Sequence, residues 1–598
     1  MKSFFKILTK LTLLLLIAIT LTGSFYMLEY SSQPKANHIL QMTPTIILLN
    51  LLTIGFVWFI LFMIVNRIWL ASLICSVFCG IIAIVNHFVL LFHNMPLSFL
   101  TLRNFKTAMN VINGYSLPLD ATVRILVIIN SIIAFLCLLS FFFIKEPRNG
   151  VRKRLIYNIP ILATISITLY FCYCGPSPLK PQQTVGWLWS EGYWNYGYAT
   201  CTVESFHTSI NCVSKPEGYS ENKIAKINLP VIDTVNNTKP DVILILNESF
   251  YDLKLVTEFE TDFPYMSQIK SLDNLLSGYA IVPSSGGGTN YSEYELLTSN
   301  SMYLLPAATP FNTLNLNEAN SIVAHMNALG YHTIGAHSES GSNYSRTVAY
   351  NSLGFDQTFF DKDFNCTSTY CDRIYETDES LYKNMIHWYE AAPKDMPRFF
   401  YLLTIQNHGG YELSADEYDT VHVKQDFGDL TDDVNEFLTS IRLSDYAFKN
   451  LTDYFLTVDR PVIICMVGDH SPKFSTTLPT SGYDNEELDL IHRKVPFFIW
   501  ANYSLEQHDL GTISLNYIIP TLLDVANIPK NPYYSYQLDL KNQIPIITSY
   551  GKYYDNLGNS YIFSDNSQIP NHAKINEYFH LEYYNIMSSV KESLLTLK

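Results

Sequence analysis

Charged residues are scarce in this sequence: Asp, Glu, Lys and Arg make up 16% of its 598 residues, whereas 48% are hydrophobic. The chain is too long for one ordinary domain, and its low charge argues against a protein that is soluble throughout. Five apolar runs approach the ~20 residues that a membrane-spanning helix needs. They cover residues 5–26, 44–66, 68–92, 123–144 and 155–173. The first run lacks a small-residue cleavage pattern, so we interpret it as a span and not as a signal peptide.

Acidic residues are almost absent from the first part of the chain. Residues 1–175 hold 13 Lys or Arg but only 3 Asp or Glu. Basic residues gather before the first span, between the second and third spans, and between the fourth and fifth. By the positive-inside rule the amino terminus is therefore cytoplasmic. Five spans then place the remainder outside the cell, which predicts a multi-pass protein of the cell membrane with a large extracellular part.

A basic stripe is missing from the remainder. Residues 176–598 hold 26 basic and 51 acidic residues, which excludes nucleic acid as a partner because nothing would neutralise its backbone. The cysteines also lack the spacing of a structural zinc site. Two local pairs, Cys201 with Cys212 and Cys366 with Cys371, could form disulfides in an oxidising exterior, leaving Cys465 as the buried odd one.

No internal repeat is evident, and composition divides the chain into four parts. These are a five-helix transmembrane domain (1–175), a juxtamembrane linker (176–239), a catalytic domain (240–540) and a C-terminal extension (541–598), which we interpret as a small subdomain. Strands are predicted at 242–246, 279–282, 332–336, 399–404, 462–467 and 495–500. Helices are predicted at 291–301, 319–329, 379–390, 432–455 and 516–525. This alternation predicts an α/β domain with a mostly parallel sheet and helices on both faces.

A glycine-rich segment, Ser-Ser-Gly-Gly-Gly-Thr-Asn at residues 284–290, lacks the Lys-Ser or Lys-Thr pair of a Walker loop. It follows a predicted strand and opens a predicted helix. Thr289 would then stand at the positive end of a helix dipole among bare backbone amides. That position suits a nucleophile that attacks a phosphate, or a loop that only binds one. A plain surface turn is the alternative, since short glycine motifs often arise by chance.

Unusual polar residues follow five of the predicted strands, and ligands bind at the carboxyl ends of strands in such sheets. In chain order they are Glu248, Thr289, His337 with Glu339 and Arg346, His408, and Asp469 with His470. Carboxylates, one imidazole and a deprotonated Thr suit a divalent ion such as Mn²⁺, Mg²⁺ or Zn²⁺.

The chemistry of these side chains points to phosphoryl transfer. A metal beside Thr289 would lower the pKa of its hydroxyl and polarise a phosphoryl oxygen. Arg346 is suited to bidentate binding of phosphate. His408 could protonate a leaving oxygen and later deprotonate an incoming hydroxyl.

Five short segments together carry a family resemblance. They are Leu-Asn-Glu-Ser-Phe at 246–250, the loop 286–295 with its Glu-Tyr-Glu, Tyr-Asn-Ser-Leu-Gly-Phe-Asp at 350–356, Gln-Asn-His-Gly at 406–409 and Val-Gly-Asp-His-Ser-Pro at 467–472. With the five spans and a linker segment at 216–220, the chain to about residue 540 resembles the lipoteichoic acid synthase group of phosphoglycerol transferases. That group lies within the sulfatase and alkaline phosphatase superfamily, so a sulfatase-like fold is implied.

The resemblance implies roles for particular residues. A metal, most often Mn²⁺, would be held by Glu248, Thr289, Asp469 and His470, with Thr289 as the nucleophile. Arg346 and His408 would contact the substrate phosphate and glycerol, and His337 and Tyr344 would line the same pocket. Tyr344 stands where several relatives carry Trp, and Glu339 where some carry Asp or another polar residue. Both departures bear on the preference for acceptor and headgroup.

We therefore predict a phosphoglycerol transferase. It would move glycerol phosphate from phosphatidylglycerol to a hydroxyl of a glycolipid, teichoic acid or polysaccharide through a phospho-threonine intermediate. A phosphoethanolamine transferase is the nearest alternative, because it shares the Thr nucleophile, the five spans and ectodomain disulfides. A sulfatase is disfavoured, since its Cys/Ser-x-Pro-x-Arg motif is missing. A non-catalytic membrane sensor would be favoured by loss of a metal ligand, and all four ligand positions are filled.

Overall fold

The computed structural model covers the whole chain and divides it into two compact units, Met1–Cys212 and Val213–Lys598. The structure describes residues 2–587 apart from 33–38, 40–41, 94–96, 98–118, 145, 147–149, 175–192, 194–195, 211–212, 228, 230–238, 306–308, 315, 318, 342, 366–374, 412–419, 481, 507–508 and 564–568.

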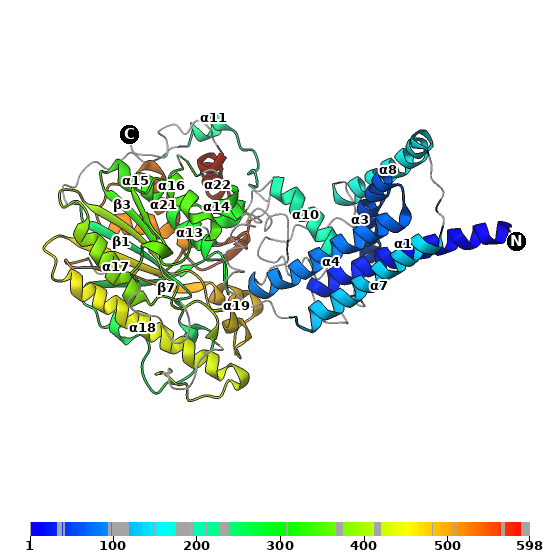
Figure 1. Ribbon diagram of the computed structural model, residues 1–598. Coiled ribbons are helices and arrows are strands. Elements are labelled where there is room, and N and C mark those ends of the chain that lie inside the picture. The colour runs from blue at the N-terminus through cyan, green and yellow to red at the C-terminus, as the bar shows by residue number, and fades with distance from the viewer. Residues whose placement is uncertain are drawn as a thin grey trace. The chain divides into compact units, whose positions relative to one another are not determined.

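The first unit contains the five predicted spans as long helices (Figure 1). They are α1 (Lys2–Ser32), α3 (Pro44–Val65), α4 (Ile68–His93), α7 (Ala121–Phe143) and α8 (Val151–Tyr173). All five contain a stretch long and apolar enough to cross a membrane. The prediction of a five-helix transmembrane domain is thus confirmed, and it indicates a multi-pass membrane protein.

A shorter helix, α10 (Tyr198–Ile210), docks onto this bundle through its amino terminus. The Tyr198 amide donates to Oε1 of Glu29 at 2.7 Å, and the Thr200 amide donates to Oδ1 of Asn50 at 3.0 Å. These polar side chains of α1 and α3 satisfy amides that a helix start leaves unpaired. Gly197 precedes the helix with φ of +78°, and a Cβ there would come within 2.6 Å of Asn50. The junction therefore requires glycine.

The cysteine prediction fails in part. Cys201 is a buried free thiol, so the disulfide considered between it and Cys212 is absent. Cys212, Cys366 and Cys371 themselves lie outside the described residues. Cys465 is buried and free, as expected of the odd cysteine.

The second unit is built on an eight-stranded sheet with the order β4-β3-β5-β1-β6-β7-β2-β8. Its strands are β1 (Asp241–Asn247), β2 (Leu275–Ile281), β3 (His332–His337), β4 (Gln357–Phe359), β5 (Arg398–Leu403), β6 (Val462–Gly468), β7 (Lys494–Ala501) and β8 (Thr512–Ser514). Every neighbouring pair is parallel except the two that β7 makes with β6 and β2. The central strand β1 is buried along its whole length, which explains its unbroken apolar sequence.

Helices cover both faces of this sheet (Figure 1). Helices α17 (Asp378–Ala391) and α18 (Thr431–Phe455) lie on one face, and α13 (Thr289–Thr298), α15 (Ile322–Ala328), α16 (Arg346–Leu353) and α21 (Pro532–Lys541) lie on the other. The remaining α-helices described in this unit are α11 (Glu221–Ile224), α12 (Ser267–Lys270), α14 (Pro310–Thr313), α19 (Asn485–His492), α20 (Ile518–Val525) and α22 (His572–Met587). The predicted α/β fold with helices on both faces is confirmed.

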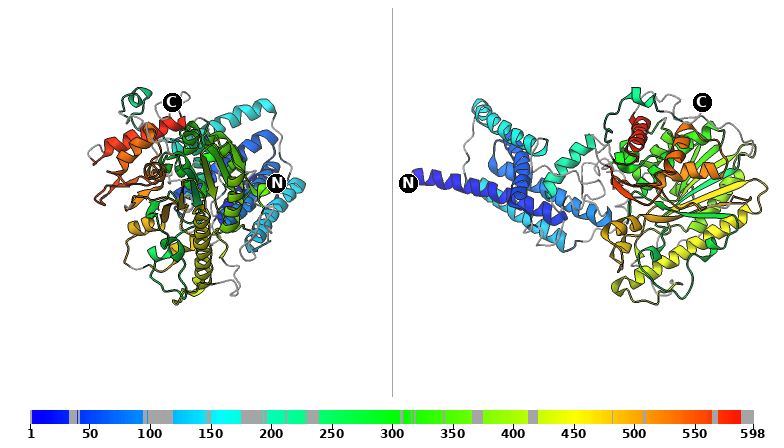
Figure 2. Two further views of the ribbon diagram at one scale, coloured as in Figure 1. Left: turned by 90° about the vertical axis from the view of Figure 1, so that its left-hand side faces the viewer. Right: turned by 180° about the vertical axis from the view of Figure 1, so that it is seen from behind.

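The C-terminal residues form the small subdomain that the sequence predicted, but one helix returns to the main sheet domain. Strands β9 (Ile546–Ile547), β10 (Lys552–Tyr554) and β11 (Ser560–Ile562) make a three-stranded antiparallel sheet, seen from two further sides in Figure 2. On α22, Glu582 accepts a hydrogen bond from the Ser301 amide, and Asn585 accepts one from the Asn320 amide at 2.7 Å. Two loops of the sheet domain are therefore held by α22.

Strand direction decides where the site lies. Strands β1, β2, β3, β5 and β6 all run the same way, because β7 is antiparallel to both of its neighbours. Their carboxyl ends meet at one edge of the sheet, where ligands bind in open α/β folds.

Candidate active site

Glu248 is the first residue after β1, at the centre of this edge. Its amide donates to Oγ1 of Thr404 at 3.0 Å, which ties the end of β1 to the end of β5. Ser249 then turns the chain with φ of +48°, a left-handed conformation that is costly for a residue other than glycine. The turn points the Ser249 hydroxyl back to donate to Oε1 of Glu248 at 2.9 Å.

Asp469 and His470 follow β6, the neighbour of β1. Gly468 allows the two strand ends to approach, because a Cβ at this position would lie 2.2 Å from the backbone oxygen of Phe250. The Ser249 amide donates to Oδ1 of Asp469 at 2.7 Å. The Asp469 carboxylate is thereby fixed through a backbone contact between two adjacent strand ends.

Thr289 arrives from the far side of β7 by way of the glycine-rich loop. Gly288 has φ of +94°, and a Cβ there would lie 2.8 Å from Oγ of Ser284, so glycine is required where the loop turns into α13. Ser292 docks the first turn of this helix by donating to the backbone oxygen of Asp469 at 2.6 Å. As a result, Oγ1 of Thr289 donates to Oε2 of Glu248 at 3.2 Å and lies 3.4 Å from Nε2 of His470.

Glu248, Asp469 and His470 can together hold a metal ion, since one ligand atom from each lies within 4.8 Å of the others. Nδ1 of His470 lies 3.0 Å from the backbone oxygen of Ser471, and that hydrogen bond leaves the Nε2 lone pair facing the carboxylates. Oδ2 of Asp469 is buried and has no hydrogen-bond partner among the residues that the structure describes, although it lies 3.2 Å from Nε2 of His470. Two buried carboxylates with an orphaned oxygen and an inward imidazole fit a divalent cation.

Burial and the short distances between charged groups shift the pKa values of Asp469 and His470. Burial and the charge of Glu248 raise the pKa of Asp469 to about 7. Burial acts to lower the pKa of His470, but the facing Asp469 and Glu248 carboxylates raise it above its ordinary value. Protons and a metal would therefore compete for this cluster.

His337, at the end of β3, and Arg346, at the start of α16, are both buried. Nδ1 of His337 lies 3.0 Å from the backbone oxygen of Leu403. Burial and the charge of Arg346 hold the pKa of His337 well below its usual range, so its ring is neutral. Arg346 donates through Nε to Oε2 of Glu293 at 2.9 Å.

The other predicted substrate-binding residues are less enclosed. Tyr344 has φ of +53°, and the centre of its ring lies 5.1 Å from Cζ of Arg346. Glu339 lies further along the loop after β3, where burial and the charge of Asp361 raise its pKa. His408, after β5, is exposed and packs edge-on against Tyr375 at 5.2 Å between ring centres. None of these three belongs to the cluster of possible metal ligands found among the described residues.

Sequence reasoning missed the buried network beneath Glu248. Asp378, at the start of α17, accepts hydrogen bonds from Asn247 at 2.8 Å and from Ser444 at 2.6 Å. Asn407 donates to Asn247 at 3.0 Å and to Ser444 at 3.0 Å. These residues join the ends of β1 and β5 to α17 and α18. The only signal in the sequence was an amide residue at each of two strand ends, and nothing there predicted Asp378 as their partner.

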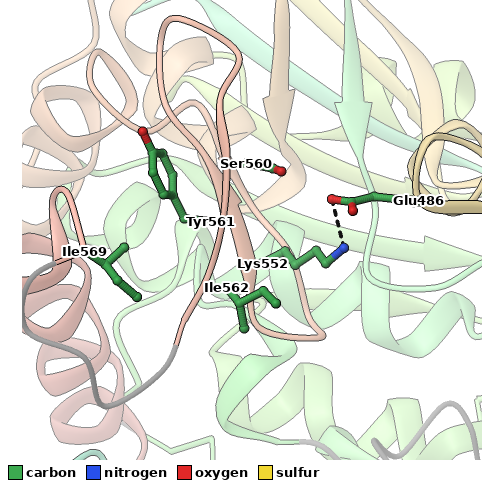
Figure 3. Close-up of a pocket in the computed structure, with 6 residues that line it drawn as sticks. All are labelled: Glu486, Lys552, Ser560, Tyr561, Ile562 and Ile569. Carbon is green, nitrogen blue, oxygen red and sulfur yellow. Dashed lines mark ion pairs between the residues drawn. The ribbon is translucent and has the colours of Figure 1, made fainter. Parts of the chain in front are cut away.

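A separate cavity of about 400 Å³ lies between α19 and the β10–β11 hairpin. Figure 3 shows Lys552 reaching toward Glu486 across it, with Nζ 2.8 Å from Oε1. Four further residues line it: Ser560, Tyr561, Ile562 and Ile569. The lining includes no residue predicted for the site and no nucleophile beside metal ligands, so the Glu248 cluster is the candidate site.

Comparison with known proteins places the sheet domain in a family. The sequence profile of the Sulfatase family matches residues 240–528, which contain the sheet and all the strand-end residues described above. This segment is a sulfatase-family domain. The Streptococcus pyogenes phosphoglycerol transferase GacH, solved in complex with sn-glycerol-1-phosphate, aligns with a TM-score of 0.50 and 18% identity. The alignment covers 63% of this chain and 96% of GacH, and it shows that the two share a fold.

Two relatives by sequence extend the comparison of the sulfatase-family domain. A Rhizobium meliloti (strain 1021) protein, named for modification of cyclic beta-1,2-glucan, is 28% identical over 366 residues, covering 58% of this chain and 55% of that protein. The lipoteichoic acid synthase-like YvgJ of Bacillus subtilis (strain 168) is 24% identical over 224 residues, covering 35% of this chain and 34% of YvgJ. The chain thus spans about half the length of the first relative and a third of the second.

Proposed function

We propose that the protein is a membrane-anchored phosphoglycerol transferase. It would take glycerol phosphate from phosphatidylglycerol and pass it to a hydroxyl of a glycan or polyglycerolphosphate. The observation that carries the proposal is the position of Oγ1 of Thr289, at the start of α13 and 3.2 Å from Glu248, with His470 3.4 Å away. A hydroxyl at a helix amino terminus, beside a metal-binding cluster, is placed to attack an anionic phosphodiester.

The reaction would have two steps. Oγ1 of Thr289, its proton already lost to solvent, forms a bond to phosphorus while the bond from phosphorus to the diacylglycerol oxygen breaks, and protonated His408 supplies the proton to that oxygen. The acceptor hydroxyl then attacks the phosphoglyceryl-threonine, gives its proton to His408 and releases Thr289. Arg346 binds the phosphate oxygens in both steps.

A divalent metal, with Mn²⁺ first and Mg²⁺ or Zn²⁺ as alternatives, would be held by Glu248, Thr289, Asp469 and His470. When bound, it would lower the pKa of the Thr289 hydroxyl and offset the negative charge of the phosphate. The buried carboxylates of Glu248 and Asp469 support such a cation, because no Lys or Arg forms an ion pair with either among the described residues.

The relatives support the substrates that we propose. GacH is a phosphoglycerol transferase bound to sn-glycerol-1-phosphate, which fits a glycerol phosphate headgroup as the transferred group. YvgJ is lipoteichoic acid synthase-like, and the Rhizobium meliloti relative is named for glucan modification. A polyglycerolphosphate or glycan hydroxyl is therefore the acceptor class. The five spans and the positive-inside pattern support a catalytic domain outside the cell membrane.

The proposal is tested by incubating the full-length purified enzyme and Mn²⁺ with headgroup-labelled phosphatidylglycerol, without acceptor. We expect diacylglycerol to accumulate and the intact protein to gain the mass of one phosphoglyceryl group on Thr289. The matched control is Ser284→Ala, which removes a hydroxyl of the same loop that has no hydrogen-bond partner in the described part of the chain. In a parallel incubation with phosphatidylethanolamine, consumption of that lipid and not of phosphatidylglycerol would identify the alternative phosphoethanolamine transferase. A Thr289→Ala variant with full activity would exclude both functions.

A further inference from the structure

Glu293 is a fully buried carboxylate one helical turn after Thr289 on α13. Its Oε2 accepts a hydrogen bond from Nε of Arg346 at 2.9 Å. Its Oε1 accepts one from the hydroxyl of Tyr350 at 2.6 Å. Arg346 and Tyr350 lie four residues apart on α16, so both oxygens of the carboxylate are held by one face of a neighbouring helix.

We propose that Glu293 is the positioning residue that orients the guanidinium of Arg346 toward the substrate phosphate. The inference rests on the proposed function, since it assumes that Arg346 binds the phosphate group of the donor. It assigns a role to a carboxylate that takes no part in the chemistry and lies outside the metal cluster.

Glu293 binds the guanidinium of Arg346 on one side only. The carboxylate uses Nε, and the ring of Tyr344 lies 5.1 Å from Cζ. Within the described part of the chain, Glu293 is the one hydrogen-bond partner seen for Arg346. The edge formed by the two terminal nitrogens is thus left for a ligand, and that edge can donate two parallel hydrogen bonds to two phosphate oxygens.

The position of Glu293 also links the phosphate-binding group to the nucleophile. Thr289 and Glu293 are four residues apart, which is a rise of about 6 Å along one face of a helix. One rigid helix therefore sets the nucleophile and the anchor of Arg346 at a fixed separation. The hydroxyl of Tyr350 prevents the carboxylate from rotating, because it occupies the second oxygen.

The charge state agrees with an anchoring role. Burial acts to lower the pKa of Arg346, but the facing Glu293 carboxylate raises it above its ordinary value. The guanidinium therefore stays protonated although only 4% of its side chain is exposed. Removing Glu293 would leave that charge buried and unpaired, and also free to turn away from the phosphate.

Chemical rescue provides the first test. Arg346→Ala should inactivate the full-length Mn²⁺-loaded enzyme, and guanidinium chloride at millimolar concentration should restore part of the activity, because Glu293 and Tyr350 still form its binding place. We expect at least about tenfold less rescue in Arg346→Ala/Glu293→Gln. The matched control is Arg346→Ala/Glu295→Gln, which alters another buried carboxylate of α13. Equal rescue in all three variants would overturn the inference.

Binding of inorganic phosphate provides the second test, by calorimetry on the full-length protein with Mn²⁺. We expect Glu293→Gln to weaken binding about ten- to hundredfold and to raise the donor KM more than it lowers kcat. Tyr350→Phe removes a single hydroxyl and should weaken binding several-fold, so it decides the question if Glu293→Gln does not fold. Unchanged affinity in folded variants would refute the positioning role alone. Absence of phosphate binding and of diacylglycerol release in the wild-type protein would instead refute the proposed function.

Discussion

Nε2 of His470 lies 3.4 Å from Oγ1 of Thr289, although the two residues are 181 positions apart in the chain. The same nitrogen lies 3.2 Å from Oδ2 of Asp469 and 3.5 Å from Oε1 of Glu248. Three segments that follow three parallel strands therefore converge on one point. A hydroxyl that is held against two buried carboxylates and an imidazole has the surroundings of a metal-assisted nucleophile.

Activity should require the hydroxyl group of Thr289, and the branched shape of the side chain should not be sufficient. Thr289→Val keeps the branched side chain but removes the oxygen, and we expect the initial rate of diacylglycerol release to fall at least about 10³-fold. Thr289→Ser keeps the oxygen and should retain measurable turnover and the covalent intermediate. Both are measured as initial rates and as intact protein mass, and a Thr289→Val enzyme that turns over like the wild type would contradict the assignment.

Loss of a carboxylate ligand should abolish stabilisation by metal. In the wild-type protein, Mn²⁺ at about 100 times its Kd should add about 2.7 kcal/mol to the unfolding free energy, seen as a raised Tm. Glu248→Gln should lose this shift, and chelation should remove it from the wild type. Glu379→Gln on the surface of α17 serves as the control. A full Mn²⁺ shift in Glu248→Gln would mean that the cluster does not bind the metal.

Ser249 should increase the metal affinity of the site through its hydrogen bonds to the two carboxylate ligands. Its hydroxyl donates to Glu248, and its amide donates to Asp469. Removing such a supporting contact typically weakens metal affinity 10- to 100-fold, and we expect this of Ser249→Ala in a titration with Mn²⁺. Ser249→Gly separates the two causes, because it also lacks the hydroxyl but relieves the left-handed backbone. An affinity restored by glycine would show that the backbone, and not the hydroxyl, matters.

Stability of the second unit should fall as the pH rises above about 5. Burial raises the pKa of Glu295 from 4.5 to about 8, with Arg493 acting in the opposite direction. A raised pKa means that the folded state holds the proton more tightly. Its contribution is therefore full below pH 4.5 and is lost as the pH rises through about 8, by up to about 1.4 kcal/mol per pH unit.

Glu295→Gln should flatten this slope when Tm is recorded between pH 5 and 8. The Gln side chain at this position is neutral at every pH, and it keeps an oxygen that can accept the hydrogen bond from the Met302 amide. Glu582 on α22, whose pKa burial also raises, should leave a residual slope that Glu582→Gln removes. Parallel curves for the wild-type and Glu295→Gln proteins would refute the prediction.

Element types followed from the sequence where the elements are long and strongly patterned. The five spans and the six predicted strands were found because uniform apolar runs and buried strands leave a local signal. The strands β4 and β8, with three residues each, were missed because such short segments carry no period. The antiparallel direction of β7 also could not be predicted, since direction depends on how the connections cross the sheet and not on composition.

The sequence alone determined which chemical groups stand at the strand ends. Glu248, Asp469 and His470 follow β1 and β6 directly, so their place at the edge of the sheet follows from chain connectivity. The position of Thr289 depends further on three consecutive glycines with positive φ, which carry the chain back across β7.

Only the tertiary structure decided which side chains face one another. It paired Glu293 with Arg346 and Asn247 with Asp378, and it left the side chain of His408 exposed. The partners are 53 and 131 residues apart in the chain, so these pairings depend on how helices pack against one another and against strand ends. The sequence pattern of a helix shows which of its faces is buried, but it does not show which other element packs against that face.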